Sequence, residues 1–145
     1  MNATRIIKRD HEAARELFNK FKTIGEDKRA DVEIKILDAL SYHEQMEDIY
    51  FYPALKEKLG GSDELMETEI AQKNLASKIL AARVFLGDKK ERITEIMESL
   101  LEHAEKEEKE ILSRAEKLFT AIELENLGKL MEPESAVENA GIGGN

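Results

Sequence analysis

The sequence predicts an all-α protein, folded as an up-down-up-down four-helix bundle with a short C-terminal helix. The 145 residues include only two prolines and 37% charged residues, and glutamate, lysine, leucine, alanine and isoleucine, which are abundant, favour helices. Apolar residues recur at spacings of three and four along four segments, which is the period of amphipathic helices. Glycine-containing turns separate these segments.

The turns set the order and direction of the expected helices. Gly25 ends the first segment, Gly60-Gly61-Ser62-Asp63 ends the second, and Gly87-Asp88 ends the third, so that each segment is roughly 22–32 residues long. Short connections between long amphipathic helices make neighbouring helices antiparallel. Pro53 is expected to kink or end the regular ladder late in the second helix.

The C-terminal part of the chain is weaker in pattern. A fifth helix is expected from about Thr120 to Met131. The bundle domain is therefore assigned to residues 1–132. Residues 133–145 are small, polar and glycine-rich, and we expect them to form a disordered tail.

Each of the four segments carries a stripe that is expected to face the core. The stripes are Ile7, His11, Ala14, Phe18 and Phe21; Ile36, Leu40, His43, Glu47, Tyr50 and Ala54; Met66, Glu69, Lys73, Ala76, Leu80 and Val84; and Ile96, Leu100, His103, Glu107, Ile111 and Leu118. All three histidines of the chain and four charged residues lie on these stripes. Charged groups are almost never fully buried unless they are paired or bind a metal.

The polar residues on the stripes are expected to lie at a similar height along the bundle axis. His11 lies about 15 residues before the first turn and His43 about 15 after it, and Lys73 and His103 are placed in the same way about the third turn. In an antiparallel bundle, each pair then lies at a similar height.

The two histidines of the second and fourth segments are each followed by a glutamate four residues later. This spacing places His43 with Glu47, and His103 with Glu107, on one face of a helix. Inward glutamate and histidine on facing helices are how bundles build di-iron carboxylate sites, and this donor set suits iron, manganese or zinc. One such histidine alone is more often a satisfied core residue, but three at one level predict a metal site.

Composition excludes several other classes of function. The chain has no cysteine, which excludes disulfides, cysteine-ligated zinc, iron–sulfur clusters and thiol nucleophiles. A net charge of −9 argues against nucleic acid or an anionic membrane as partner. No apolar run approaches a membrane span, and Met1–Glu12 lacks a signal-peptide core, so a cytoplasmic location is expected. His43–Glu47 begins like a zinc-protease helix but lacks the second histidine.

These motifs resemble the bacterial hemerythrin-like domain, also called the HHE cation-binding domain, over roughly residues 4–131. The stretches that carry the resemblance are Ile6–His11, Ala39–Asp48 with Phe51–Leu55, His103–Leu112 and Leu127–Met131. The resemblance implies a non-haem iron site in a four-helix bundle, usually with two irons bridged by carboxylates. It carries over the ligands His11, His43, Glu47, His103 and Glu107.

One position departs from that family's pattern. Ungapped alignment places Lys73 where the family's third helix carries a histidine, and an ammonium has no lone pair for a metal. Glu69 could complete a two-metal site instead. Alternatively, the site holds one metal while Lys73 pairs with Glu47 or Glu107, Lys73 ligates as a neutral amine, or the site is empty and held by ion pairs.

Three further residues lie near the motifs. Glu44 and Glu108 are expected to be solvated neighbours of the site, with Glu44 a minor ligand candidate. Tyr50 is expected to pack against the core with its hydroxyl tied, or to donate a hydrogen bond at the site.

Three functions remain open on the sequence. The first is a module that binds or senses O2, NO or a redox change at buried iron, or that handles iron. The second is an enzyme that turns over peroxide or oxidises ferrous iron at the same site. The third is an interaction domain that has lost its metal through Lys73. The sequence identifies neither a protein partner nor an oligomeric state.

Overall fold

The computed structural model describes residues 1–133, and every regular element in them is helical, with no strand. The all-α class predicted from the sequence is therefore confirmed for this part of the chain. The tail expected over residues 133–145 lies, beyond Pro133, outside the described residues.

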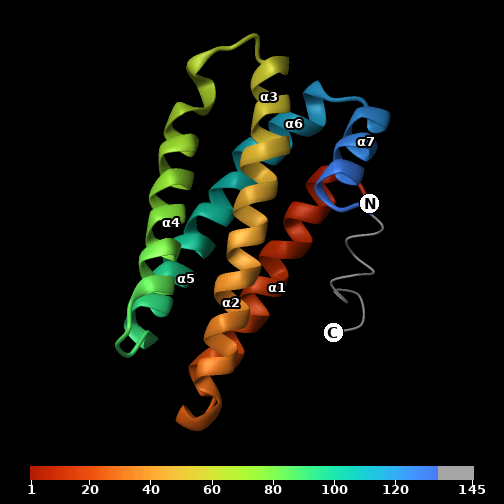
Figure 1. Cartoon of the computed structure of the whole chain (residues 1–145). Coiled ribbons are helices and arrows are strands. Elements are labelled where there is room, and N and C mark those ends of the chain that lie inside the picture. The colour runs from red at the N-terminus through yellow and green to blue at the C-terminus, as the bar shows by residue number, and fades with distance from the viewer. Residues whose placement is uncertain (134–145) are drawn as a thin grey trace.

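The chain forms four long helical rods and one shorter helix (Figure 1). The first rod is α1 (Ala3–Thr23). The second runs without a break from α2 (Glu26–Met46) through the π-helical turn η1 (Glu47–Phe51) into α3 (Tyr52–Lys58). The third is α4 (Met66–Val84), preceded by the 3-10 turn η2 (Asp63–Leu65). The fourth comprises α5 (Lys90–Lys106), the π-helical turn η3 (Glu107–Leu112) and α6 (Ser113–Leu118), and α7 (Ala121–Met131) follows.

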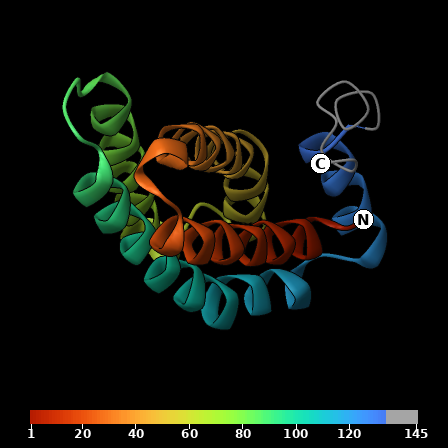
Figure 2. The ribbon, with the colours of Figure 1, turned by 90° about the horizontal axis from the view of Figure 1, so that it is seen from below.

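Contacts between the rods close a ring. Helix α1 packs against α2 and α5, and α4 packs against the same two helices. Figure 1 shows the chain reversing direction at each turn between rods. Figure 2 shows α7 near the N-terminus, away from the α4–α5 hairpin, and α7 contacts both α1 and η1.

Local sequence explains the helix boundaries. Asn2 caps α1 by accepting a hydrogen bond from the backbone N–H of Arg5, and Thr120 and Glu123 form a capping box at the start of α7. Gly60 and Gly61 have φ angles of 67° and 76°, the left-handed region that favours glycine, so they permit the turn after α3.

Helix α7 is held against the N-terminus by a close backbone approach. A Cβ atom on Gly128 would lie 2.2 Å from the carbonyl oxygen of Met1. Only glycine allows this contact, because any side chain would force the two segments apart.

The apolar core is divided into two clusters. One contains, among others, Phe18 and Phe21 of α1, Leu40 of α2, Ile79 of α4 and Leu100 of α5. The other lies toward α3, α6 and α7 and is built on residues such as Ile7, Phe51, Leu55, Leu112 and Leu127. The polar residues of the predicted site fall, along each rod, between the members of these two clusters.

The stripe predicted to face inward on the third helix is wrong. Met66, Leu80 and Val84 are 52%, 63% and 68% exposed. The residues of α4 that are buried are Thr68, Gln72, Leu75, Ile79 and Ala82. Both faces of this helix carry apolar residues, so spacing alone did not determine which one faces the core.

The two π-helical turns shift the buried face of their rods. Each begins at the glutamate of a His-x-x-x-Glu motif, Glu47 or Glu107. A π turn contains an additional residue, so the position five residues after the glutamate returns to the same face. Consequently Tyr52 and Leu55 are buried where Tyr50 and Ala54 were expected. Pro53 does not end the rod, which continues to Lys58.

No helix in residues 1–133 combines the length and apolar character that crossing a bilayer requires.

Candidate metal centre

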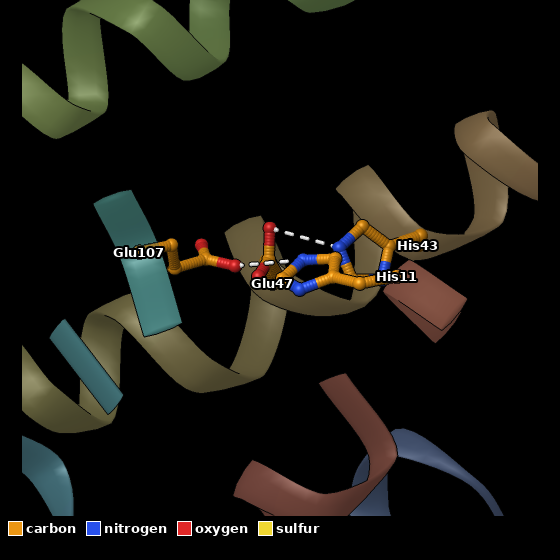
Figure 3. A group of neighbouring side chains, drawn as sticks. All are labelled: His11, His43, Glu47 and Glu107. Atoms are coloured by element: carbon orange, nitrogen blue, oxygen red, sulfur yellow. Dashed lines mark ion pairs between the residues drawn. The ribbon is translucent and has the colours of Figure 1, made fainter. Parts of the chain in front are cut away.

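Four side chains from three rods meet in the layer between the two apolar clusters (Figure 3). They are His11 of α1, His43 of α2, Glu47 at the start of η1 and Glu107 at the start of η3. One ligand atom from each lies within 4.8 Å of the other three. All four side chains are buried, with exposed fractions of 5% or less. The structure thus brings together four of the six ligands predicted from the sequence.

The facing atoms of this group lack partners. The Nε2 of His11, both carboxylate oxygens of Glu47 and Oε1 of Glu107 are buried and make no hydrogen bond within the described residues. His11 Nε2 approaches Glu107 Oε1 to 3.0 Å, and His43 Nε2 approaches Glu47 Oε1 to 3.4 Å. Buried polar atoms without a partner destabilise the folded protein unless a bound ligand interacts with them. Two imidazoles and two carboxylates therefore fit a cation such as iron, manganese or zinc.

Carboxylates behind the two histidines orient their rings. The Nδ1 of His43 donates to Asp10 at 3.1 Å, and the Nδ1 of His11 donates to Glu108 at 2.7 Å. Such partners fix the orientation of each ring, so that its Nε2 atom is directed at the centre. Glu108 is therefore a half-exposed neighbour of the site, as the sequence suggested, but it also holds His11 in place.

His103 lies at the edge of the group. Its Nε2 is 3.7 Å from Glu107 Oε2 and 3.2 Å from the amide oxygen of Gln72. The amide nitrogen of Gln72 donates to Asp48 at 3.1 Å, so the amide oxygen is the atom turned toward His103. The nitrogen of His103 that faces Glu107 therefore carries a hydrogen and is bound to Gln72.

Glu69 and Lys73 are not part of the group. Glu69 lies near the surface, where Lys56 approaches it to 3.3 Å, and Lys73 is exposed. The reason is the orientation of α4, which turns Gln72 to the core in place of Lys73. The expectation that a buried Lys73 ammonium pairs with Glu47 or Glu107 is wrong, and Glu69 does not face the centre.

Tyr52 is a site residue that the sequence analysis missed. Its hydroxyl donates to Glu107 Oε2 at 2.5 Å, and the side chain is buried. Tyr50, which was expected to be the tyrosine near the site, is only half-buried. The sequence feature that could have indicated Tyr52 is Pro53. A proline interrupts the regular helical hydrogen bonding, so the helical period could not be assumed to continue through Tyr52.

Burial and mutual repulsion set the protonation of the carboxylates. Burial, together with the charge of Glu107, raises the pKa of Glu47 well above its ordinary value. Burial raises the pKa of Glu44 to about 9, and the charges of Glu107 and Asp48 add to this. For Glu107, burial acts in the same direction, but contacts with His11 and Glu47 outweigh it and lower the pKa to about 2. The pair Glu47 and Glu107 thus holds a proton that a cation can replace.

Glu44 was expected to be solvated, but it is buried. It is 3% exposed, and neither carboxylate oxygen has a hydrogen-bond partner within the described residues. It is therefore not solvated. Its expected role as a minor ligand remains a prediction.

The fold and this site define a class: a helical protein with a buried histidine and carboxylate cluster suited to a metal ion. The family model described as hemerythrin HHE cation binding domain matches residues 2–115, and the chain belongs to this family. The matched range contains every predicted ligand and ends before α7. Comparisons with curated proteins and with solved structures give no significant match.

Proposed function

We propose that this protein is a non-haem iron protein that binds a small ligand such as O2 or NO, or responds to a redox change, at a centre held by His11, His43, Glu47 and Glu107. The observation that carries the proposal is the buried set of four converging side chains with unpartnered ligand atoms. An up-down-up-down four-helix bundle, with α7 as the added C-terminal helix, accounts for the ring of contacts among α1, α2, α4 and α5.

The geometry favours one iron ion in this set. Donors on opposite sides of an ion with bonds of about 2.1 Å are about 4.2 Å apart, so a group within 4.8 Å closes on one ion after small shifts. A second ion needs further donors. His103 is hydrogen-bonded to Gln72, and Glu69 lies near the surface beside Lys56. The two-iron arrangement implied by the family resemblance therefore requires His103 to leave Gln72.

Burial of the centre limits what can reach it. The four side chains are almost completely enclosed, which suits molecules of two or three atoms and excludes a large organic substrate. An iron ion held there supplies an exchangeable position and a one-electron change of oxidation state. The protein residues keep bulk water out, orient the two imidazoles through Asp10 and Glu108, and hold a proton on the Glu47 and Glu107 pair.

Peroxide turnover is a second candidate, and Tyr52 is the observation that favours it. A phenol that donates to Glu107 places a proton next to the centre. Such a group can donate a proton to a reacting oxygen. Oxidation of ferrous iron, and iron handling more broadly, use the same donors.

An anaerobic titration separates these functions. Protein reconstituted with ferrous iron is mixed in turn with NO, with O2 and with hydrogen peroxide, and optical and electron paramagnetic resonance spectra are recorded. A binding or sensing protein gives a reversible spectral change with NO or O2 and no sustained consumption of peroxide. Repeated consumption of peroxide supports the enzyme instead. Absence of any response from the iron-loaded protein contradicts both.

A further inference from the structure

A groove of about 410 Å³ lies between α2 and α4, which run side by side in Figure 1. Its walls include Ser41 and Glu44 of α2, Asp48 of η1, and Ala76, Leu80 and Arg83 of α4. None of the four residues of the metal cluster lines this groove, and none lines two other grooves, one along α5 and one beside η2. The α2–α4 groove is lined by Glu44, which is the neighbour of His43 in the chain.

Glu44 is placed between this groove and the centre. It lines the groove, yet its carboxylate is buried and both oxygens lack hydrogen-bond partners in residues 1–133. Its pKa is raised by the charge of Glu107, a member of the cluster, and by the charge of Asp48, which lines the same groove. A buried carboxylate without a partner destabilises the fold, so its presence beside a solvent-open groove indicates a ligand that it meets there.

The charges along the groove suit a cation. Asp48 is exposed, and among the described residues one of its oxygens accepts a hydrogen bond, from the amide of Gln72. The basic groups nearby are Lys73, which is exposed, and Arg83, whose guanidinium donates to Asp38 at 2.8 Å and to Ser41. Asp38 offsets the charge of Arg83, and the charge of Lys73 acts on Asp48. The charges that act on Glu44 itself are the carboxylates of Glu107 and Asp48.

We propose that the α2–α4 groove is the route by which the metal ion enters, and that Glu44 is the carboxylate that transfers a divalent cation from Asp48 at the groove to Glu47 and Glu107 at the centre. The inference rests on the proposed metal site. Glu44 binds the ion transiently and is not part of the final ligand set, so it determines the rate of loading and leaves the amount bound unchanged.

The experiment measures Co²⁺ uptake by the full-length metal-free protein in a stopped-flow instrument, followed by the visible absorption of bound cobalt. Glu44→Gln keeps the shape of the side chain and removes the carboxyl group that can release its proton and bind a cation. We expect this variant to bind the same number of Co²⁺ ions with the same final spectrum, at a rate at least tenfold below that of the unchanged protein. The matched control is Glu98→Gln on the exposed face of α5, which should load at the unchanged rate.

A second pair of variants tests the groove without altering any charge. Ala76→Phe fills the groove, and we expect it to slow uptake by a similar factor, whereas Ala71→Phe, on an exposed face of the same helix, should not. Circular dichroism establishes that each variant is folded before uptake is measured.

The outcomes separate this inference from the function on which it rests. If the unchanged protein takes up no Co²⁺, the proposed metal site fails and the route fails with it. If the unchanged protein binds Co²⁺ and Glu44→Gln loads equally fast, only the route through Glu44 is overturned. A lower final amount of Co²⁺ in Glu44→Gln shows that Glu44 is a permanent ligand, which also overturns the inference.

Discussion

Gln72 accepts a hydrogen bond from His103 at 3.2 Å, so the Nε2 atom of one of the three histidines of the chain already has a partner. The amide nitrogen of Gln72 donates to Asp48, so the amide oxygen is the atom that accepts from His103. Gln72, and not Lys73, occupies the inward position on α4. We propose that this position limits the number of ions that the centre holds.

Replacing Gln72 by histidine tests this point directly. Gln72→His supplies a new imidazole and releases His103, so we expect bound iron to rise from about one to about two ions per chain. Lys73→His is the control, because residue 73 is exposed and should leave the count unchanged. Elemental analysis after anaerobic reconstitution gives both values. A second ion in Lys73→His, but not in Gln72→His, would contradict the orientation of α4.

Tyr52 is expected to affect the metal through Glu107. Tyr52→Phe removes the hydroxyl that donates to Glu107 at 2.5 Å and keeps the ring that packs in the core. Loss of such a supporting hydrogen bond typically lowers metal affinity by roughly 10–100-fold. Competition with a chelator measures the affinity. Tyr50→Phe should bind as the unchanged protein does, and an equal loss in both variants would refute the specific role of Tyr52.

The metal-free protein should become less stable as the pH rises. The pKa of Glu44 is raised to about 9 by burial, so between its ordinary value near 4.5 and about 9 the folded state holds a proton that the unfolded chain has lost. The contribution of Glu44 to the free energy of unfolding is therefore complete below pH 4.5 and is lost as the pH rises to about 9. Between these values the free energy falls by up to about 1.4 kcal/mol per pH unit.

Urea denaturation of the metal-free protein at pH 5, 7 and 9 measures this dependence. Glu44→Gln has no such proton to lose, so its advantage in the free energy of unfolding over the unchanged protein should grow with pH. An advantage that is constant across this range would show that Glu44 is ionised in the folded protein.

Gly128 should be intolerant of any side chain. Gly128→Ala places a Cβ atom 2.2 Å from the carbonyl oxygen of Met1, so α7 and the N-terminus must separate. We expect a loss of about 1–3 kcal/mol in the free energy of unfolding, which is the usual range for overpacking. Lys129→Ala, on the exposed face of α7, provides the control for thermal denaturation. Equal melting temperatures of the two variants would contradict the close packing of α7.

The sequence predicted much of the fold and of the site because apolar residues and potential ligands recur at helical spacing. In α1, the spacing of His11, Phe18 and Phe21 matches one helical face, and all three are buried. In α4 the same reasoning failed, because Leu75 and Ile79 on one face compete with Leu80 and Val84 on the other. Helical period cannot choose between two apolar faces; packing against the rest of the bundle does.

The residues that support the site were harder to predict for another reason. Tyr52 reaches Glu107 only because a π turn shifts the register by one residue, and periodicity analysis assumes a constant helix. Glu108 faces His11 across two helices separated by 97 positions in the chain. Pairings of this kind depend on the relative rotation of the helices, which local sequence does not determine.

The most direct test of the account is the iron content of the protein, purified without a histidine tag and reconstituted anaerobically with ferrous iron, together with that of two matched variants. We predict about one iron per chain in the unchanged protein, the same amount in Glu69→Ala, and almost none in Glu47→Ala. Glu69 lies near the surface beside Lys56, whereas Glu47 is buried in the cluster. Absence of iron from the unchanged protein, or equal binding by Glu47→Ala, would contradict the assignment of this buried cluster as the metal centre.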